Sequence, residues 1–369
     1  MAQQPATIQN IVDSQCEALL ASMQKAHPDA DVGISVALFY PDNPDVPGFY
    51  GYGSAGTSGA PTSETVYAIG SVTKVFTATL AAYLSVENVI GALNETVAGT
   101  WLTNPGCSQT GVSGAYWDGL TFADLATQTS GMPDEANGPY SIQLFADQPP
   151  SCRQIEWWNN GQSGFAGNQG SWIYSSAGFV TLGFALTGAA GSGYTSLLSN
   201  VITTPVGMPN TFAADNVPSG ATLAQGYDTN SRAVPITDAA DLKSSAQDML
   251  AWLAAVYQAM ELDANAGTLT PLQQAIAQTA SIWIENPEGP GNKPLNFSMG
   301  LGWQIPTIAS VQTLTKNGAT DKGGCTSWVG LTRYASGMTP VGIALMTNQD
   351  GVRPDGTAHR ILEQIIELG

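Results

Sequence analysis

The stretch "YAIGSVTKVFTATLAAYL", residues 67–84, decides how this chain is interpreted. Apart from Ser71, Lys74 and a few threonines, it consists of apolar, aromatic and small residues, a composition typical of a buried helix. Residues three apart on a helix share one face, so the Lys74 ammonium can reach the Ser71 hydroxyl. Only six lysines occur in 369 residues. A lysine among apolar neighbours therefore calls for a chemical explanation.

A serine and a lysine at the start of a helix suit nucleophilic catalysis. The first helical turn gathers free backbone N–H groups and the positive end of the helix dipole, which favour a developing oxyanion. Serine is a weak nucleophile alone and needs a neighbouring base. Lysine can be that base, because an apolar pocket lowers the pKa of an ammonium group.

The SxxK spacing alone is weak evidence for a catalytic pair, because Ser22 and Lys25 have the same spacing. That second pair falls late in an amphipathic helix and is interpreted as a solvated face. The two histidines, His27 and His359, lie within or at the end of terminal helices, which disfavours a Ser-His-Asp triad. GxSxG, HExxH, Walker and GxGxxG patterns are absent from the sequence. If the protein is an enzyme, a serine–lysine mechanism is the one that remains.

Two further stretches contain partners for such a mechanism. "SWIYSSAGFVTLGFAL" has Tyr174 just before a predicted helix, where a phenol near a lysine can pass a proton to a leaving group. The alternative is that the aromatic ring of Tyr174 only fills space at the start of the helix. "TLTKNGATDKGG" has Lys316 at the end of a predicted strand, where a backbone N–H can bind an oxyanion and an ammonium a carboxylate. The alternative is that Lys316 is an exposed lysine in a surface hairpin, an interpretation that fits Lys322 better.

Composition and charge exclude several classes of partner. The chain has 11 Lys+Arg against 29 Asp+Glu, a formal net charge of -18. This argues against nucleic acid and anionic membranes, both of which demand a basic surface. No apolar run reaches the roughly 18 residues of a membrane span, so no membrane insertion is expected. The first residues, "MAQQPATIQN", lack signal-peptide features.

The acidic surface, the scarcity of lysine and an even number of cysteines favour an exported protein, periplasmic or secreted; the cytoplasm is the alternative. None of the four cysteines has metal-site spacing. Cys107 and Cys152 both fall in Gly/Asn-rich loop sequence and are the preferred disulfide pair. The alternative is that Cys16, Cys107, Cys152 and Cys325 are all free and buried.

The pattern of elements predicts one sheet built from the two ends of the chain. Residues 8–26 form an amphipathic helix, followed by two strands around "PDNPDVP". Near the C-terminus, "LGWQI", "VQTLTK", "TSWVGLTRY" and "PVGIALMTN" are strands, and 356–368 is a helix. The segments between are mostly helical: 71–87, 121–129, 176–188, 193–203, 244–260 and 270–281. We therefore expect a single domain with a sheet lobe (1–70 and 296–369) and a mostly helical inserted lobe (71–295).

The three stretches around Ser71, Tyr174 and Lys316, in this order, resemble the penicillin-recognising serine hydrolases. The class C β-lactamases are the most similar branch, together with low-molecular-weight D,D-peptidases and esterases of the same fold. Further recurrent family phrases are "LATQTSGMP" (125–133), "VITTPVGMPNTF" (201–212), "LAQGY" (223–227), "LKSSAQDMLAWL" (242–253) and "MGLGW" (299–303). The resemblance covers nearly the whole chain. It implies an α/β (α+β type) fold, β-lactamase/transpeptidase-like, with an antiparallel sheet flanked by helices.

The resemblance also implies a role for each matching residue. Ser71 is the acylated nucleophile, Lys74 its proton partner, and Tyr174 the general base and acid. Lys316 is the electrostatic anchor of the third motif. The oxyanion hole consists of the backbone N–H groups of Ser71 and Ala319. Gly318 and Glu135 fall on the substrate-binding side, Glu135 at the rim of the cleft and without an assigned chemical step. No metal or organic cofactor is implied.

Two motif positions depart from the family pattern. Ser176 stands where the tyrosine motif has an asparagine that contacts the substrate, and it has a shorter side chain with a different hydrogen-bonding repertoire. The third motif, usually Lys-Thr-Gly, is Lys316-Asn317-Gly318. Both changes concern substrate recognition and leave the acyl-transfer residues in place.

Three functions are consistent with these residues. Each involves a small-molecule or peptide ligand, and the sequence does not determine the oligomeric state. The first is a serine hydrolase acting on amides such as β-lactams or D-alanyl peptides, favoured by Lys316, which suits a substrate carboxylate. The second is a carboxylesterase or transesterase of the same fold. Its candidate acyl pocket is aromatic, with ordinary packing as the alternative: Trp157, Trp158, Trp172, Tyr140 and Tyr174. The third, a catalytically silent binding domain, is disfavoured by the intact motif residues.

Overall fold

The two ends of the chain pair in one antiparallel sheet. In the computed structural model, β1 (Gly33–Phe39) pairs with β14 (Gly342–Thr347), with Val36 opposite Leu345. The structure describes residues 3–56, 59–97, 99–134, 148–213, 216–320 and 322–368. The chain divides into two compact units. The first comprises Met1–Thr73, Thr203–Gly267 and Pro306–Gly369, and the second Lys74–Ile202 and Thr268–Ile305.

The sheet of the first unit has the order β2-β1-β14-β13-β12, with β11 pairing with β12. The remaining bounds are β2 (Phe49–Gly53), β11 (Thr307–Ile308), β12 (Val311–Ala319) and β13 (Thr326–Thr332). Nearly every residue of β1, β13 and β14 is buried. A sheet covered on both faces has strands rich in apolar residues, as β1 and β14 are.

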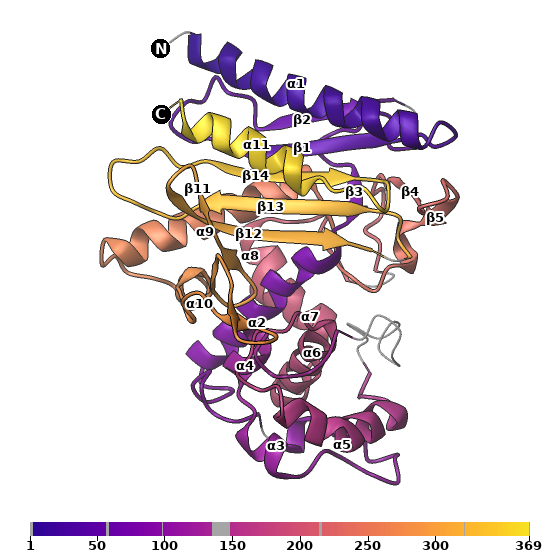
Figure 1. Ribbon diagram of the computed structural model, residues 1–369, viewed down its shortest axis with the longest axis vertical. Coiled ribbons are helices and arrows are strands. Elements are labelled where there is room, and N and C mark those ends of the chain that lie inside the picture. The colour runs from indigo at the N-terminus through magenta and orange to yellow at the C-terminus, as the bar shows by residue number, and fades with distance from the viewer. Residues whose placement is uncertain are drawn as a thin grey trace. The chain divides into compact units, whose positions relative to one another are not determined.

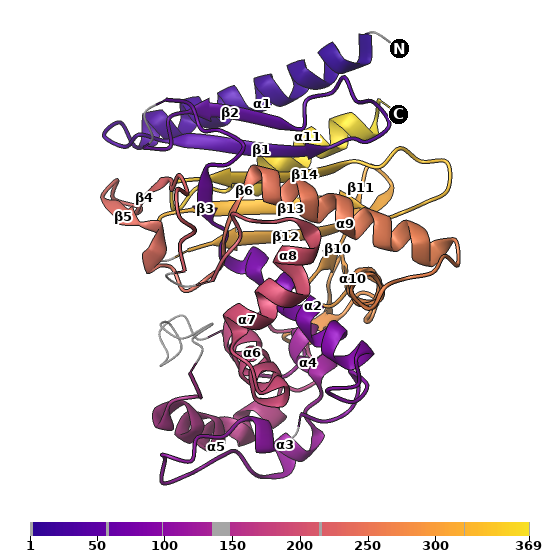
Figure 2. The same ribbon diagram turned by 180° about the vertical axis from the view of Figure 1, so that it is seen from behind.

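Helices cover both faces of this sheet. α1 (Gln3–Ala26) and α11 (Asp355–Ile366) pack against each other on one face, and α9 (Ala246–Ala264) packs on β1 and β14 from the other (Figures 1 and 2). The core on the α1 and α11 side includes Ile8, Val12, Ile343 and Ile361. The smaller elements of this unit are β3 (Val66–Ala68) with β6 (Lys243–Ser245), β4 (Gln225–Tyr227) with β5 (Ala233–Pro235), and α8 (Thr204–Val206).

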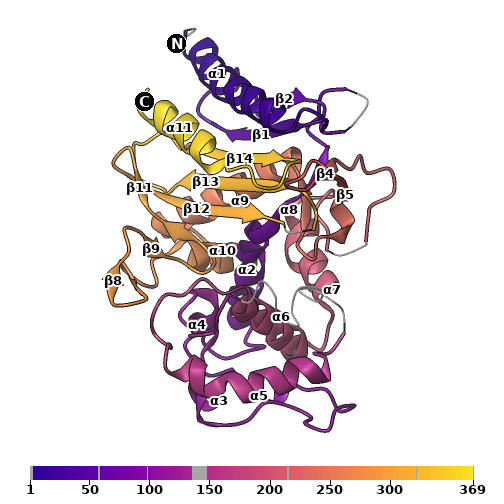
Figure 3. The ribbon, with the colours of Figure 1, turned by 45° about the vertical axis from the view of Figure 1, so that its right-hand side comes forward.

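The second unit is mostly helical. Its helices are α2 (Thr73–Val86, of which Thr73 belongs to the first unit), α3 (Ala115–Gly119), α4 (Phe122–Ala126), α5 (Cys152–Ala166), α6 (Ser176–Ala190), α7 (Tyr194–Leu198) and α10 (Pro271–Ala280). Its short strands are β7 (Glu288–Gly289) with β8 (Lys293–Pro294), and β9 (Ser298–Met299) with β10 (Gln304–Ile305). α6 is buried from Ala177 to Leu186 and packs against α4, and α3 lies beside α5 (Figure 3).

Most predicted elements form where expected, but the structure also differs from the prediction. The helix α5 was not anticipated, because "NNGQSG" within it lacks good helix formers. The predicted helical lobe, 71–295, is divided between the units, since residues 203–267, with α9, group with the sheet. A helical pattern identifies an apolar face and leaves open which element will cover it.

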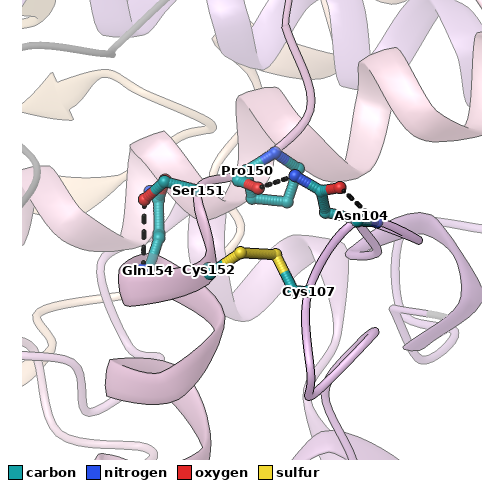
Figure 4. The surroundings of a disulfide bond; sticks show 7 residues. Asn104, Cys107, Pro150, Ser151, Cys152 and Gln154 are labelled. Carbon is teal, nitrogen blue, oxygen red and sulfur yellow. Dashed lines mark hydrogen bonds between the residues drawn. A yellow bond between two sulfur atoms is a disulfide. The ribbon is translucent and has the colours of Figure 1, made fainter.

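The predicted disulfide between Cys107 and Cys152 is confirmed (Figure 4). It joins a loop to the first residue of α5, where Ser151 caps the helix by accepting from the Gln154 N–H. Cys16 and Cys325 are free and buried, and burial raises the pKa of both thiols to about 12. Both therefore stay protonated and unreactive at neutral pH.

Among the described residues, no helix combines the length and the apolar character that crossing a lipid bilayer requires.

Removing the disulfide is expected to destabilise the protein. Its cysteines are 45 residues apart, and a closed loop of that length contributes about 4 kcal/mol through the entropy of the unfolded chain. The double variant Cys107→Ser/Cys152→Ser should unfold at a lower urea concentration than the oxidised wild type. Reductant should lower the stability of the wild type and leave that of the double variant unchanged. Equal midpoints for oxidised wild type and double variant would contradict this expectation.

Candidate active site

Ser71 lies in a short 3₁₀ turn, η1 (Gly70–Val72), that runs directly into α2. The turn closes through a hydrogen bond from the Val72 N–H to the Ile69 carbonyl, 3.2 Å long. The side chain of Ser71 is half-buried, whereas the residues from Val72 to Leu80 are all buried. The predicted helix start at Ser71 is therefore confirmed, with the serine as its accessible residue.

Gly70 allows η1 to approach β12. Its φ angle is +51°, in the left-handed region that glycine tolerates best. A Cβ atom at this position would lie 2.5 Å from the Ala319 nitrogen and 2.6 Å from its carbonyl oxygen. No other residue type fits there without displacing backbone. The peptide before Ser71 thus packs directly on the backbone of Ala319.

The pairing of β12 with β13 determines where the Ala319 N–H points. Thr320 donates its backbone N–H to the Cys325 carbonyl at 3.1 Å, so this is a hydrogen-bonded pair. Opposed pairs alternate along an antiparallel ladder between hydrogen-bonded and non-hydrogen-bonded. Ala319 and Thr326 are therefore a non-hydrogen-bonded pair. The Ala319 N–H points away from β13, at the edge of β12 where Gly70 packs. The β12–β13 ladder therefore does not use this N–H.

Lys316, Asn317 and Gly318 lie inside β12, which continues to Ala319 rather than ending at Lys316 as predicted. Lys316 is 3% exposed, and its ammonium donates to the carbonyl oxygen of Asn317 at 3.2 Å and to its Oδ1 at 3.3 Å. Gly318 faces the Ile69 carbonyl, which accepts from the Ser327 hydroxyl at 2.7 Å. A side chain at Gly318 would collide with that carbonyl.

In the second unit, the Lys74 ammonium lies near two aromatic rings and the Ser176 hydroxyl. Its side chain is 4% exposed. The ammonium nitrogen lies 5.0 Å from the centre of the Tyr174 ring and 5.8 Å from that of Phe179. It donates to the Ser176 hydroxyl at 3.4 Å. Ser176, predicted as a substrate-binding residue, thus also contacts Lys74. The structure brings Lys74, Tyr174 and Ser176 together.

The start of α6 holds this group in place. Ser175 is the N-cap of α6 and accepts from the Gly178 N–H at 2.8 Å. Ser176 donates its N–H to Asp134 Oδ1 at 3.1 Å. Gln128 also contacts this segment, through its side chain and its carbonyl. The sequence analysis did not identify Asp134 or Gln128. The sequence feature that could have identified Gln128 is a non-glycine residue directly after α4, where a helix usually has glycine.

The alternative candidates have ordinary surroundings. Ser22, Lys25, His359 and Lys322 are exposed, and His27 Nδ1 lies 2.9 Å from the Ser231 hydroxyl. The aromatic residues proposed for an acyl pocket pack against other rings: Trp157 with Phe165, Trp158 with Trp117 and Phe184, and Trp172 with Phe297. Glu135 and Tyr140 lie outside the described residues.

The profile of one protein family, described as Beta-lactamase, matches residues 24–366. The chain belongs to the Beta-lactamase family. A β-lactamase from Pseudomonas fluorescens is 25% identical over 324 residues, which are 85% of this chain and 79% of that protein. The predicted family is thereby confirmed, and with it the enzyme class, a serine hydrolase of the β-lactamase type.

Solved structures of this family share the fold. A β-lactamase from Sulfitobacter sp. EE-36 superposes with a TM-score of 0.71 at 20% identity, covering 98% of each chain. A class C β-lactamase from Rhodobacter sphaeroides has a TM-score of 0.69 at 20% identity, covering 96% of this chain and 99% of that one. The predicted fold class is confirmed.

Substituting Gly70 tests the close approach of η1 to β12. Gly70→Ala places a Cβ against the Ala319 backbone and forces alanine into a left-handed conformation, which should lower the free energy of unfolding by roughly 2 to 4 kcal/mol. Reaction of Ser71 with a fluorophosphonate should also slow strongly. Gly164→Ala is the control, because its Cβ meets nothing within 4 Å on the exposed side of α5. A Gly70→Ala protein as stable and reactive as the control would refute the close packing.

Proposed function

We propose that this member of the Beta-lactamase family forms an acyl-enzyme on Ser71 with amide substrates that carry a carboxylate, of the β-lactam or D-alanyl-peptide type. The observation that carries the proposal is the packing of the Gly70–Ser71 turn on Ala319, whose N–H points away from β13. Two backbone donors close to a nucleophile are what a tetrahedral oxyanion requires.

In the proposed reaction, the Ser71 hydroxyl attacks the substrate carbonyl and its proton passes to Lys74 or Tyr174. The N–H groups of Ser71 and Ala319 stabilise the negative charge on the carbonyl oxygen. The intermediate collapses to an ester on Ser71, and Tyr174 gives a proton to the departing nitrogen. Water then attacks the ester, with the same groups taking and returning its proton. The contact of Lys74 with the Tyr174 ring, at 5.0 Å, supports a shared proton path between these two residues.

The substrate class rests on Lys316. A hydrogen bond between this ammonium and a substrate carboxylate joins two charged groups, and it is stronger than a hydrogen bond to a neutral acceptor such as the Asn317 amide. The names of similar proteins support the same class: the relative from Pseudomonas fluorescens is a β-lactamase, and a protein of similar fold from Pseudomonas syringae is described as a β-lactamase/D-alanine carboxypeptidase.

A carboxylesterase or transesterase is the second candidate. The Lys316 ammonium already contacts Asn317 Oδ1, which competes with a substrate carboxylate, and the Ser176 hydroxyl already accepts from Lys74. Both contacts weaken recognition of a β-lactam-type substrate and leave the acyl-transfer groups unchanged. An uncharged ester needs neither contact.

We also propose that the protein is exported, to the periplasm or the medium. The disulfide between Cys107 and Cys152 supports this location, because structural disulfides persist in oxidising compartments.

Intact mass during incubation with a penicillin distinguishes the candidate functions. A lasting adduct of the whole penicillin that is absent in Ser71→Ala is the result expected of a peptidase with slow deacylation. Consumption of the drug without a lasting adduct is expected of a β-lactamase. No adduct and no consumption, with hydrolysis of a p-nitrophenyl ester, would favour the esterase. Full activity of Ser71→Ala on any substrate would refute the mechanism, provided that its melting temperature matches the wild type.

The rate of acylation should fall at low pH. Either Lys74 must be neutral or Tyr174 ionised to accept the Ser71 proton, and acid removes both forms. Pre-steady-state acylation rates should therefore decrease as the pH is lowered, while circular dichroism shows a folded protein. A rate that stays constant down to about pH 4 would contradict a lysine–tyrosine base.

A further inference from the structure

An unusual residue follows the helix α4. The helix ends in a pair of capping hydrogen bonds: Gln128 donates its N–H to the Leu125 carbonyl at 3.4 Å, and Thr129 donates to the Asp124 carbonyl at 2.8 Å. This pattern needs a left-handed residue directly after the cap, and glycine is the usual one. Here Gln128 has φ +67°. A non-glycine residue in that conformation is strained, and such strain is concentrated at functional sites.

The side chain of Gln128 is 4% exposed and reaches the segment before α6. Its Oε1 accepts the Ser175 N–H at 2.6 Å, and its own carbonyl oxygen accepts the Ile173 N–H at 2.9 Å. One residue therefore accepts the backbone donors on both sides of Tyr174. Glycine at 128 would remove the strain and keep the carbonyl contact, but it would leave the Ser175 N–H without its acceptor.

The neighbouring donors are held in the same way. Trp172 donates its N–H to the Glu288 carbonyl at 2.7 Å, and Ser176 donates to Asp134 Oδ1 at 3.1 Å. The backbone on either side of Tyr174 is thereby fixed within the second unit. The phenol ring that it carries lies beside the Lys74 ammonium. A proton passes efficiently only between groups held at hydrogen-bonding distance and direction.

We propose that Gln128 is a positioning residue, which holds Tyr174 in the orientation that its proton transfers need. This inference rests on the proposed function, in which Tyr174 exchanges protons with the nucleophile and the leaving group. The amide oxygen at position 128 is the critical atom. A glutamate side chain places an oxygen at the same distance from the backbone. Methionine has a similar shape but no oxygen acceptor, and asparagine is shorter by one methylene group.

The test compares Gln128→Met with Gln128→Glu. The substrate is a penicillin or a p-nitrophenyl ester, depending on which of the two the wild type turns over. Gln128→Met should lower kcat roughly tenfold to a hundredfold and change KM by no more than about twofold. Gln128→Glu should retain most of the activity. Gln154→Met is the matched control, because Gln154 is also a buried glutamine of the second unit. Within the described part of the chain, its side-chain nitrogen and oxygen have no hydrogen-bond partner. Gln154→Met should leave kcat unchanged.

Hydrogen exchange supplies a readout that does not depend on activity. In Gln128→Met, the amide of Ser175 should exchange at least about tenfold faster than in the wild type, and in Gln128→Glu at the wild-type rate. Unchanged exchange in Gln128→Met overturns the proposal, as does unchanged kcat despite faster exchange. A wild-type protein that neither substrate nor a fluorophosphonate acylates overturns the proposed function itself. The exchange rates then decide separately whether Gln128 holds the Tyr174 segment.

Discussion

The pairing of β1 with β14 is the constraint on which the first unit depends. These strands come from opposite ends of the chain, and both are almost completely buried. Once they pair, the intervening chain must leave the sheet and return to it. β13 and β12 extend the sheet from β14, so Ala319 lies two strands away from the β14 edge that joins the chain ends. The sequence-distant pairing thus determines where the backbone of Ala319 lies in the sheet.

Backbone packing, more than side-chain contacts, determines the surroundings of Ser71. Gly70 and Gly318 are needed because two backbone segments, around Ile69 and Ala319, come too close for any Cβ. The Ser327 hydroxyl satisfies the Ile69 carbonyl, so this contact leaves no buried acceptor unpaired. Contacts between backbone segments do not depend on the side chains around them. In the proposed function, Ser176 and Asn317 can therefore replace the usual family residues without moving the backbone of Ser71 and Ala319.

Periodicity predicted the strands of the sheet and the terminal helices, because their apolar residues repeat with the period of each element. It did not predict α5, whose glycines and asparagines weaken the helical pattern, or the packing of α9 on the sheet. The residue types at 71, 74, 174 and 316 were identified from motifs and a family resemblance. The roles of Asp134 and Gln128 were not, because they depend on contacts with Ser176 and Ser175, more than forty residues away in the sequence. A single sequence contains no local signal for such contacts, apart from a glutamine where a helix cap favours glycine.

The distribution of lysine supports the chemical interpretation of the two motif lysines. Lys25, Lys293 and Lys322 are exposed, as most lysines are, whereas Lys74, Lys243 and Lys316 are almost fully buried. Burying an ammonium is costly, so each buried lysine requires a compensating contact or a function. Lys243 donates to the Ala239 carbonyl and lies in β6, which pairs with the strand leading to Gly70. The proposed function would account for Lys74 and Lys316, and the contacts of Lys243 stabilise the segment that leads to Gly70.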